Sequence, residues 1–206
     1  VTDWGRILMV VPVLLSLTLP TALAASPASA PFQPATAGYR YEFPRDHGSH
    51  ARYRTEWWYY TGHLRSKNGR AFGFELTFFR RGVPPDDIKT LPSKWSISHL
   101  YLAHFAVTDI NGKKFHFSEK FSRDGLGKAG ADESRLSVWI DDWRAEAATD
   151  STGSHTVVAH DETHSLALTL QPAKPLVTHG AAGISRKGKD VSQASHYYSF
   201  TRLVTT

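Results

Sequence analysis

The stretch "RTEWWYYTGHLRSKNGRAFGFELTFFR", residues 54–80, decides the fold. Two runs rich in aromatic and other apolar residues flank the dipeptide Asn68-Gly69. Asn-Gly between such runs is the strongest short-range indication of a β-hairpin, because both residues tolerate the backbone angles of a tight turn. The stretch therefore predicts two antiparallel strands joined by a turn over residues 66–70.

The first of these strands carries large aromatic side chains on both faces. Because side chains alternate along a strand, Glu56, Trp58 and Tyr60 face one way, whereas Trp57 and Tyr59 face the other. A strand with one face in water needs bulky apolar groups only on its buried face. Aromatic residues on both faces indicate a barrel wall, whose inner face lines the interior while its outer face packs against a second layer.

Short strands and turns continue along the rest of the chain. "SHLYLAHFAVTD" (98–109) leads through an Asn-Gly turn into "FHFSEKFSR" (115–123), and "HTVVAH" (155–160) turns into "HSLALTLQP" (164–172). "SRLSVWIDDWRAEA" (134–147) alternates in character and is predicted as a strand. Since no convincing amphipathic helix interrupts these runs, we predict an all-β, antiparallel barrel or sandwich.

The composition is that of a globular chain with one hydrophobic core. The 206 residues are 41% hydrophobic and include no cysteine, so the core must form without disulfides. The formal net charge is +5, but Lys and Arg are scattered apart from "SRKGK" (185–189). Nucleic-acid-binding domains usually gather these residues in one patch or stripe, so we expect no nucleic-acid partner.

The N-terminus has the layout of a secretory signal peptide. One arginine precedes an apolar run from Ile7 to Leu19, which is followed by the small-residue sequences "ALA" and "ASA". We expect residues 1–30 to be a signal peptide and processing region, residues 31–38 a linker, and residues 39–206 the domain. The protein would then be exported to the periplasm or envelope and would meet the membrane only through the signal peptide. A retained signal anchor is the alternative.

Neither "HDETH" (160–164) nor "HGSH" (47–50) is typical of a metal site. In the metalloprotease motif H-E-x-x-H the glutamate directly follows the first histidine and the motif lies on a helix, whereas a hairpin turn is predicted at 160–164. "HGSH" has no companion block of ligands. We therefore predict no metal and no cofactor.

Five blocks of the sequence resemble the carotenoid 1,2-hydratase-like family, whose domain is also called AttH and whose members are also described as predicted secreted hydrolases. The blocks are "RTEWWYYTGHL" (54–64), "GRAFGFELTFFRR" (69–81), "AHFAVTD" (103–109), "VWIDDW" (138–143) and "KPLVTHGAAGISRKG...SHYYSFTRL" (174–203). They occur in the family's order, from about Phe43 to Leu203. The E-W-W-Y and V-W-x-D-D-W blocks are the most diagnostic.

The resemblance implies a fold of two lipocalin-like barrels in tandem, of which this chain holds the first. Family members continue beyond the block that ends at Arg202 and Leu203, so we expect the chain that ends at Thr206 to be the N-terminal portion of a longer protein. In the hydratases a catalytic aspartate lies in that further part. The resemblance also implies either a cofactor-independent hydratase or hydrolase, or a carrier that serves an ABC-type permease.

Glu56 is the first candidate for an acid. Hydration of an unactivated alkene needs an acid that protonates carbon, a wall that stabilises the cation, and one placed water. A carboxylic acid kept neutral by an apolar cavity can serve as that acid, and aromatic faces stabilise cations. The structural alternative for Glu56 is a hydrogen bond to a neighbouring strand or an ion pair with Arg54 or Arg80.

Asp141 and His104 are further candidates. On the predicted strand Asp141 shares a face with Trp139 and Trp143, which would raise its pKa; an indole-to-carboxylate hydrogen bond is the alternative. His104 lies in an apolar strand, where it could position water or substrate, or simply be a satisfied core histidine.

His196 and Tyr198 share a face if "SHYYSF" (195–200) is a strand, close in sequence to the region that the resemblance implies is active. The alternative is that Tyr197 and Tyr198 pack between the two barrels.

The sequence therefore predicts one site of two residue classes. The predicted catalytic residues are Glu56, Asp141, His104 and His196. The predicted ligand-binding residues are Trp57, Trp58, Tyr60, Phe74, Trp139, Trp143 and Tyr198. We expect this site to bind an apolar isoprenoid or lipid-like molecule. Three functions remain open: a hydratase or related enzyme, a non-catalytic carrier, and an inert structural fragment of either.

Overall fold

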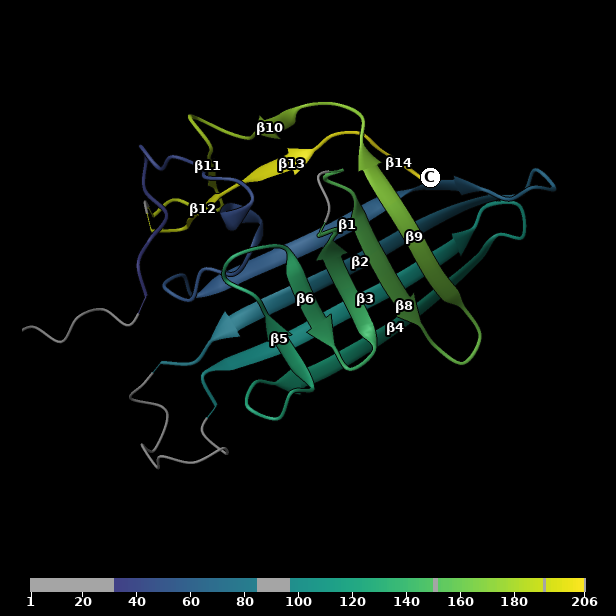
Figure 1. The fold of residues 1–206 in the computed structure, drawn as a ribbon, viewed down its shortest axis with the longest axis horizontal. Helices are drawn as coiled ribbons and strands as arrows, with labels where there is room; N and C mark the ends of the chain where they lie inside the picture. Colours follow the sequence, from purple (N-terminus) through teal and green to yellow (C-terminus); the bar gives the residue numbers. More distant parts are fainter. Residues whose placement is uncertain (1–31, 85–96, 150–151, 191, 206) are drawn as a thin grey trace, which may run out of the picture.

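Two antiparallel β-sheets packed face to face form the body of the protein (Figure 1). The computed structural model describes residues 32–84, 97–149, 152–190 and 192–205. The predicted signal peptide, residues 1–30, lies outside these ranges. Within them, the one helical element is the short 3-10 turn η1 (Arg45–His47), and no helix is long and apolar enough to cross a membrane.

The first sheet has four strands in chain order, each antiparallel to the next. They are β1 (Thr55–Arg65), β2 (Ala71–Gly82), β3 (His99–Asp109) and β4 (Lys114–Arg123). The hairpin predicted over residues 54–80 is confirmed, and its turn spans Ser66 to Arg70. Gly69 has a φ of +84°, a backbone angle that a glycine adopts without steric cost.

The second sheet has six strands in the order β14-β9-β8-β7-β6-β5. They are β5 (Ala129–Ala131), β6 (Ser137–Ile140), β7 (Trp143–Ala147), β8 (His155–His160), β9 (Ser165–Pro172) and β14 (Leu203–Thr205). In the described part of the chain no strand pairing joins the two sheets, so the predicted barrel or sandwich is an open sandwich rather than a closed barrel.

Two small ladders lie at the β1 edge of the molecule (Figure 1). Strand β10 (Leu176–Thr178) pairs with β13 (Tyr198–Phe200), and β11 (Ile184–Arg186) pairs with β12 (Ala194–His196). The hydroxyls of Tyr59 on β1 and Tyr197 lie 2.7 Å apart and join these ladders to the first sheet. The ladders therefore stand over β1, where they can enclose space beside it.

The inner faces of the two sheets form one hydrophobic core. Its largest fully buried apolar side chains are Trp143, Phe78, Phe105, Leu76, Ile140, Val138 and Val157. The alternation predicted for β1 is confirmed in the core, because Tyr60 is buried there and Trp58 packs against it, while Tyr59 is exposed on the other face. The core thus accounts for the inner aromatic residues of β1.

The prediction of one strand over residues 134–147 is wrong. Strand β6 ends at Ile140, β7 begins at Trp143, and these two residues pair across a two-residue hairpin turn made by Asp141 and Asp142. Asp141 has a φ of +52°, which aspartate tolerates better than most residues. The turn puts Ile140 and Trp143 in the core and removes Asp141 from a shared strand face with the tryptophans.

The segment predicted as a linker lies against the sandwich where the structure describes it. The Gln33 backbone N–H donates a hydrogen bond to the Arg52 carbonyl oxygen at 2.9 Å, and Ala35 is buried. Residues 32–38 therefore contribute to the folded body and do not behave as a separate spacer.

Trp143→Ala is expected to lower the free energy of unfolding by about 3–5 kcal/mol, because a large core side chain is replaced by a cavity. Trp143 is 1% exposed, its ring packs edge-on against Phe105, and its Nε1 donates a hydrogen bond to the His160 carbonyl oxygen at 2.7 Å. Urea titration measures the change. The control is Phe121→Ala on the outer face of β4, where the side chain is 68% exposed and a loss within about 0.5 kcal/mol is expected. Equal losses in both variants would contradict this account of the core.

Candidate functional site

A partly open cavity of about 840 Å³ lies between β1, the N-terminal segment and the β12–β13 region. Its lining is rich in aromatic side chains, and polar and ionisable side chains contribute as well. The aromatic lining residues are Tyr39, Tyr41, Tyr53, Trp57, Trp58, Tyr59, Tyr60, Tyr197, Tyr198 and Phe200. Ligand cavities of a few hundred to about 1,000 Å³ usually combine such apolar walls with a few polar groups, so this cavity is the candidate functional site.

The segment from residue 39 to residue 53 forms one wall of this cavity, and a close backbone contact holds it in place. The Ser49 N–H donates to the Asp132 carbonyl oxygen at 2.7 Å. A Cβ on the neighbouring Gly48 would come within 2.7 Å of the same oxygen. Only glycine permits this approach, so Gly48 fixes the path of the segment over the sandwich.

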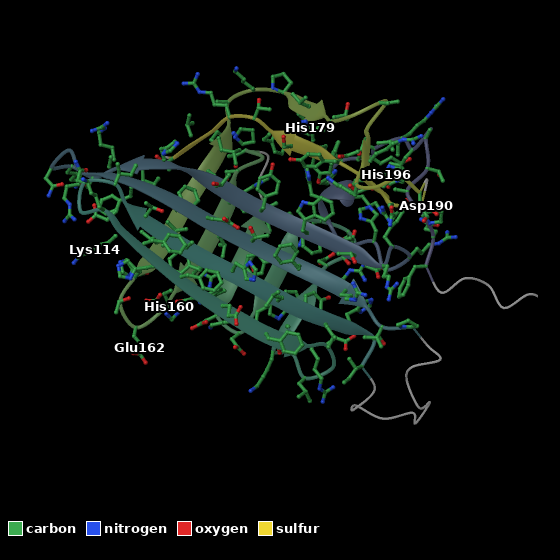
Figure 2. All side chains as sticks on the ribbon, turned by 180° about the vertical axis from the view of Figure 1, so that it is seen from behind. Lys114, His160, Glu162, His179, Asp190 and His196 are labelled. Atoms are coloured by element: carbon green, nitrogen blue, oxygen red, sulfur yellow. The ribbon has the colours of Figure 1, made fainter. Side chains whose placement is uncertain are left out.

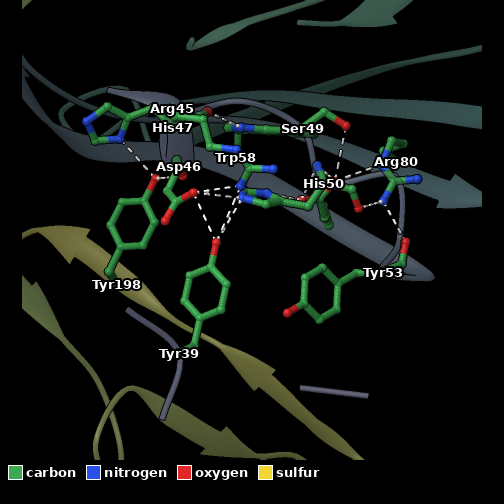
Figure 3. A network of polar contacts seen from close by, with 11 residues as sticks. Tyr39, Arg45, Asp46, His47, Ser49, His50, Tyr53, Trp58, Arg80 and Tyr198 are labelled. Carbon is green, nitrogen blue, oxygen red and sulfur yellow. Dashed lines mark hydrogen bonds and ion pairs between the residues drawn. The ribbon is translucent and has the colours of Figure 1, made fainter. Parts of the chain in front are cut away.

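Glu56 and Arg80 form a buried ion pair under this segment (Figure 3). Arg80 Nε donates to Glu56 Oε2 at 2.8 Å, and its Nη2 donates to the carbonyl oxygens of His50 and Tyr53. The Arg80 side chain is 0% exposed. The structural alternative that the sequence left open for Glu56, an ion pair with Arg80, is therefore present in the fold.

His50 bridges two carboxylates in the same network (Figure 3). Its Nδ1 lies 2.8 Å from Glu56 Oε1 and its Nε2 lies 3.2 Å from Asp46 Oδ1. Asp46 is buried and also accepts hydrogen bonds from Arg45 Nη1 at 2.7 Å and from Tyr39 Oη at 3.0 Å. The order Arg45, Asp46, His50, Glu56, Arg80 alternates positive and negative groups.

Mutual contacts outweigh burial in setting the charges of this network. Burial raises the pKa of Glu56, but the hydrogen bond from His50 and the charge of Arg80 bring that pKa below its ordinary value. Burial raises the pKa of Asp46 as well, but the hydrogen bonds from Arg45 and from the Glu42 N–H outweigh burial. The pKa of Asp46 is therefore below its ordinary value. Burial lowers the pKa of His50, but its bond to Glu56 raises it overall. The network is thus ionised, with both acids deprotonated.

Two further histidines of the cavity wall, His47 and His155, are uncharged. Burial lowers the pKa of His47 to about 4, and burial together with the charge of His47 lowers the pKa of His155 to about 4. His47 Nδ1 lies 2.9 Å from Tyr198 Oη, and His155 Nδ1 lies 3.0 Å from Tyr60 Oη. Burial raises the pKa of both tyrosines, so all four groups are neutral at physiological pH.

The cavity brings together six of the predicted site residues. They are Glu56, His196, Trp57, Trp58, Tyr60 and Tyr198. The His196 ring centroid lies 4.6 Å from that of Tyr39, whose hydroxyl donates to Asp46 of the charged network. His196 on β12, Tyr198 on β13 and Tyr197 between them all line the cavity, and the Tyr197 ring lies against the rings of Trp57 and Tyr59.

Asp141 and His104 are not brought to this cavity. Asp141 lies in the β6–β7 turn with its side chain 48% exposed, and its carboxylate is 4.0 Å from Lys120 Nζ. His160 pairs with the neighbouring Asp142, and Figure 2 shows His160 and His196 at opposite ends of the molecule. His104 lies on the outer face of β3, 4.0 Å from Glu119 and against the Phe79 ring. Strand alternation points His104 away from the interior.

Phe74, Trp139 and Trp143 also lie outside the cavity lining. Phe74 and Trp143 belong to the core between the sheets. Trp139 lies on the opposite face of β6 from its buried neighbours Val138 and Ile140, and its Nε1 donates to the Gly127 carbonyl oxygen at 3.1 Å. These three aromatic residues stabilise the sandwich and do not contact the cavity.

Five polar residues of the site were not predicted as site residues: Asp46, His47, His50, Arg80 and His155. The first three lie in "RDHGSH" (45–50), a dense run of ionisable residues, of which the sequence analysis considered only "HGSH" (47–50), as a metal site. In the residues that the structure describes, no group of three or more His, Cys, Asp or Glu side chains is placed to hold a metal ion. The density of titratable groups in this run could have indicated a site. Only the fold showed that the run contacts residues of β1 and β2.

Comparison with known proteins identifies the family of this chain. A family model described as AttH-like matches residues 34–206. A crystal structure from Nitrosomonas europaea, described as that of a putative AttH, superposes with a TM-score of 0.73 at 35% sequence identity, covering 84% of this chain and 51% of that one. The chain thus spans about half the length of this solved relative. No curated protein matches.

Glu56→Gln is expected to lower the free energy of unfolding by about 3–5 kcal/mol, because it leaves the buried Arg80 cation without its carboxylate. Urea titration measures the loss. The matched control is Glu119→Gln on β4, whose side chain is 63% exposed and for which a change within about 0.5 kcal/mol is expected.

The double variant Glu56→Gln/Arg80→Met should regain part of that loss, because it removes the unpaired cation as well. A Glu56→Gln variant as stable as the wild type would rule out a structural role for the ion pair.

Lowering the pH from about 6.5 to about 4 is expected to reduce the free energy of unfolding, through His47 and His155. Their pKa in the folded protein is about 4, whereas an unfolded histidine titrates near 6.5. The unfolded chain binds more protons in this window, so stability falls with pH. His50 does not change this pH range, because its pKa is raised in the folded protein. Its contribution to the free energy of unfolding is fully present below about pH 6.5 and is lost only as the pH rises through the pKa of the folded state. The lowered pKa values of Asp46 and Glu56 add losses at still lower pH.

Urea titrations at successive pH values test this dependence. His155→Gln should make the free energy of unfolding depend less steeply on pH below pH 6.5, by at most about 1.4 kcal/mol per pH unit. Above pH 7 both forms carry a neutral side chain, so parallel slopes there are the internal control. An unchanged slope in the acidic window would contradict the assignment.

Proposed function

Because this chain belongs to the AttH-like family, we propose that it is an exported carrier that binds an apolar, isoprenoid-like or lipid-like molecule in its aromatic cavity. The observation that carries the proposal is the cavity of about 840 Å³ with its aromatic lining. Aromatic side chains supply large apolar contact areas with little conformational freedom to lose, which suits a ligand without many polar groups.

The state of the acids favours binding over acid catalysis in this portion of the protein. An acid that donates a proton to carbon must be neutral before the reaction. Glu56 is held ionised by Arg80 and His50, and Asp46 by Arg45 and the backbone. Both carboxylates have their oxygens engaged in hydrogen bonds from these partners. Through these contacts the two carboxylates stabilise the cavity wall.

Export is the second part of the proposal. It is supported by the sequence of residues 1–30, with its apolar run and small-residue sites. A carrier in an envelope compartment would shield an apolar molecule from water between membranes, which fits a partly open cavity better than a sealed one.

Trp58→Leu is expected to weaken binding of the neutral apolar dye N-phenyl-1-naphthylamine about tenfold, because the indole face is replaced by a smaller surface. Dye emission rises in an apolar site, and titration with protein gives the dissociation constant. Trp139→Leu is the control, since Trp139 lies outside the cavity lining. Circular dichroism checks that both variants are folded. Equal affinities of the two variants, or no binding by the wild type, would overturn the carrier proposal.

A further inference from the structure

Two imidazole groups of the cavity lining lie near one another, His47 from the N-terminal segment and His155 from the start of β8. Their ring centroids lie 5.9 Å apart, and the Phe200 ring lies 5.7 Å from each. Neither histidine belongs to the ionised network of Arg45, Asp46, His50, Glu56 and Arg80. Their hydrogen bonds show which nitrogen of each ring carries the proton.

For His47 the proton lies on Nδ1. Tyr198 Oη donates its single hydrogen to the Asp46 carbonyl oxygen, at 2.8 Å. Its contact with His47 Nδ1, at 2.9 Å, therefore requires the imidazole to be the donor. A neutral ring with a proton on Nδ1 has an unprotonated Nε2. His47 Nε2 is consequently a hydrogen-bond acceptor.

For His155 the proton lies on Nε2. Among the described residues, His155 Nδ1 is the sole hydrogen-bond partner of the buried Tyr60 hydroxyl, at 3.0 Å. A buried hydroxyl that did not donate would leave its hydrogen unsatisfied, so Tyr60 is the donor and Nδ1 the acceptor. The neutral ring then carries its proton on Nε2, which is a hydrogen-bond donor.

Both Nε2 atoms are available to a ligand. No hydrogen bond within the described residues involves either of them. The polar side-chain atoms that are both sealed from solvent and unpartnered in this part of the chain are Tyr41 Oη, Arg80 Nη1 and Ser195 Oγ, so the two imidazole nitrogens are not sealed. One acceptor and one donor are thus accessible on two neighbouring rings that line the cavity.

This pair fits a neutral hydroxyl better than an ionised headgroup. A hydroxyl can donate to His47 Nε2 and accept from His155 Nε2–H, whereas a carboxylate could use only the donor. The two imidazoles are uncharged and Asp46, next to His47, is ionised, so the histidine pair itself offers an anion no favourable charge. The Lys187 ammonium group, which also lines the cavity, lies over the Trp57 and Tyr197 rings.

We propose that the ligand of this protein is an apolar alcohol, whose hydroxyl donates to His47 Nε2 and accepts from His155 Nε2–H while its hydrocarbon part lies among the aromatic walls. The inference rests on the proposed carrier function and specifies its ligand class. It assigns the two histidines as specificity-determining residues.

Competition against N-phenyl-1-naphthylamine tests the inference with farnesol and its methyl ether as probes. The ether keeps the oxygen acceptor but cannot donate to His47. The wild type is expected to bind farnesol about two- to tenfold more tightly, the range of one neutral hydrogen bond.

His47→Asn keeps an N–H for Tyr198 and removes Nε2, so it should abolish the preference for farnesol without weakening the ether. His155→Asn keeps an acceptor for Tyr60 and removes the donor, so it should weaken both probes equally and keep the preference. A purely structural role for either histidine would not produce this split. The control His63→Asn, exposed on the outer face of β1, should behave like the wild type.

The outcomes separate the two proposals. If the dye binds and both probes displace it equally well from the wild type, the alcohol inference is overturned while the carrier function stands. The same holds if the preference for farnesol survives in His47→Asn. If the dye binds but neither probe displaces it, or if the dye does not bind, the carrier function fails and the inference fails with it. If His47→Asn does not fold, His155→Asn tests the inference by itself. Equal weakening of both probes supports it, and unchanged binding of both probes overturns it.

Discussion

The buried guanidinium of Arg80 is the constraint on which the site depends. A fully buried cation is stable only if it is paired and hydrogen-bonded, and here Glu56 and the carbonyl oxygens of His50 and Tyr53 meet that need. Two of these partners are backbone groups of the segment that crosses the end of the sandwich. The same contacts that satisfy Arg80 therefore hold that segment against β1 and β2 and create a wall for the cavity.

The ionised network and the histidine pair are chemically different parts of the cavity wall. In the network, His50 lies within hydrogen-bond distance of both Asp46 and Glu56, so the charged groups face one another. In the pair, His47 and His155 are neutral, and each uses one nitrogen to bind a tyrosine hydroxyl while its Nε2 has no hydrogen-bond partner among the described residues. Stability and recognition thus use different members of one cluster of titratable groups.

Much of the fold could be predicted because its determinants are local. Asn68-Gly69 between aromatic runs predicted the first hairpin, and period-two alternation predicted which residues of β1 share a face. The prediction failed at Asp141-Asp142, where the alternating sequence pattern continues through a two-residue turn. Two aspartates fit a turn as well as an exposed strand, so the sequence pattern alone did not distinguish a turn from a continuous strand. Asp141 was therefore predicted on a strand face with Trp139 and Trp143, whereas it lies in the turn.

The sequence by itself determined the all-β architecture, the two hairpins of the first sheet and the aromatic character of the site, because these follow from alternation and turn chemistry within short segments. Only the tertiary structure decided that Glu56 is an ionised partner of Arg80, that His47 and His155 are neutral and adjacent, and that His104 lies on the opposite side of its sheet from the core. Charge state and proximity depend on burial and on neighbours far away in the chain. His47 and Tyr198, for example, are 151 residues apart in sequence and share a hydrogen bond.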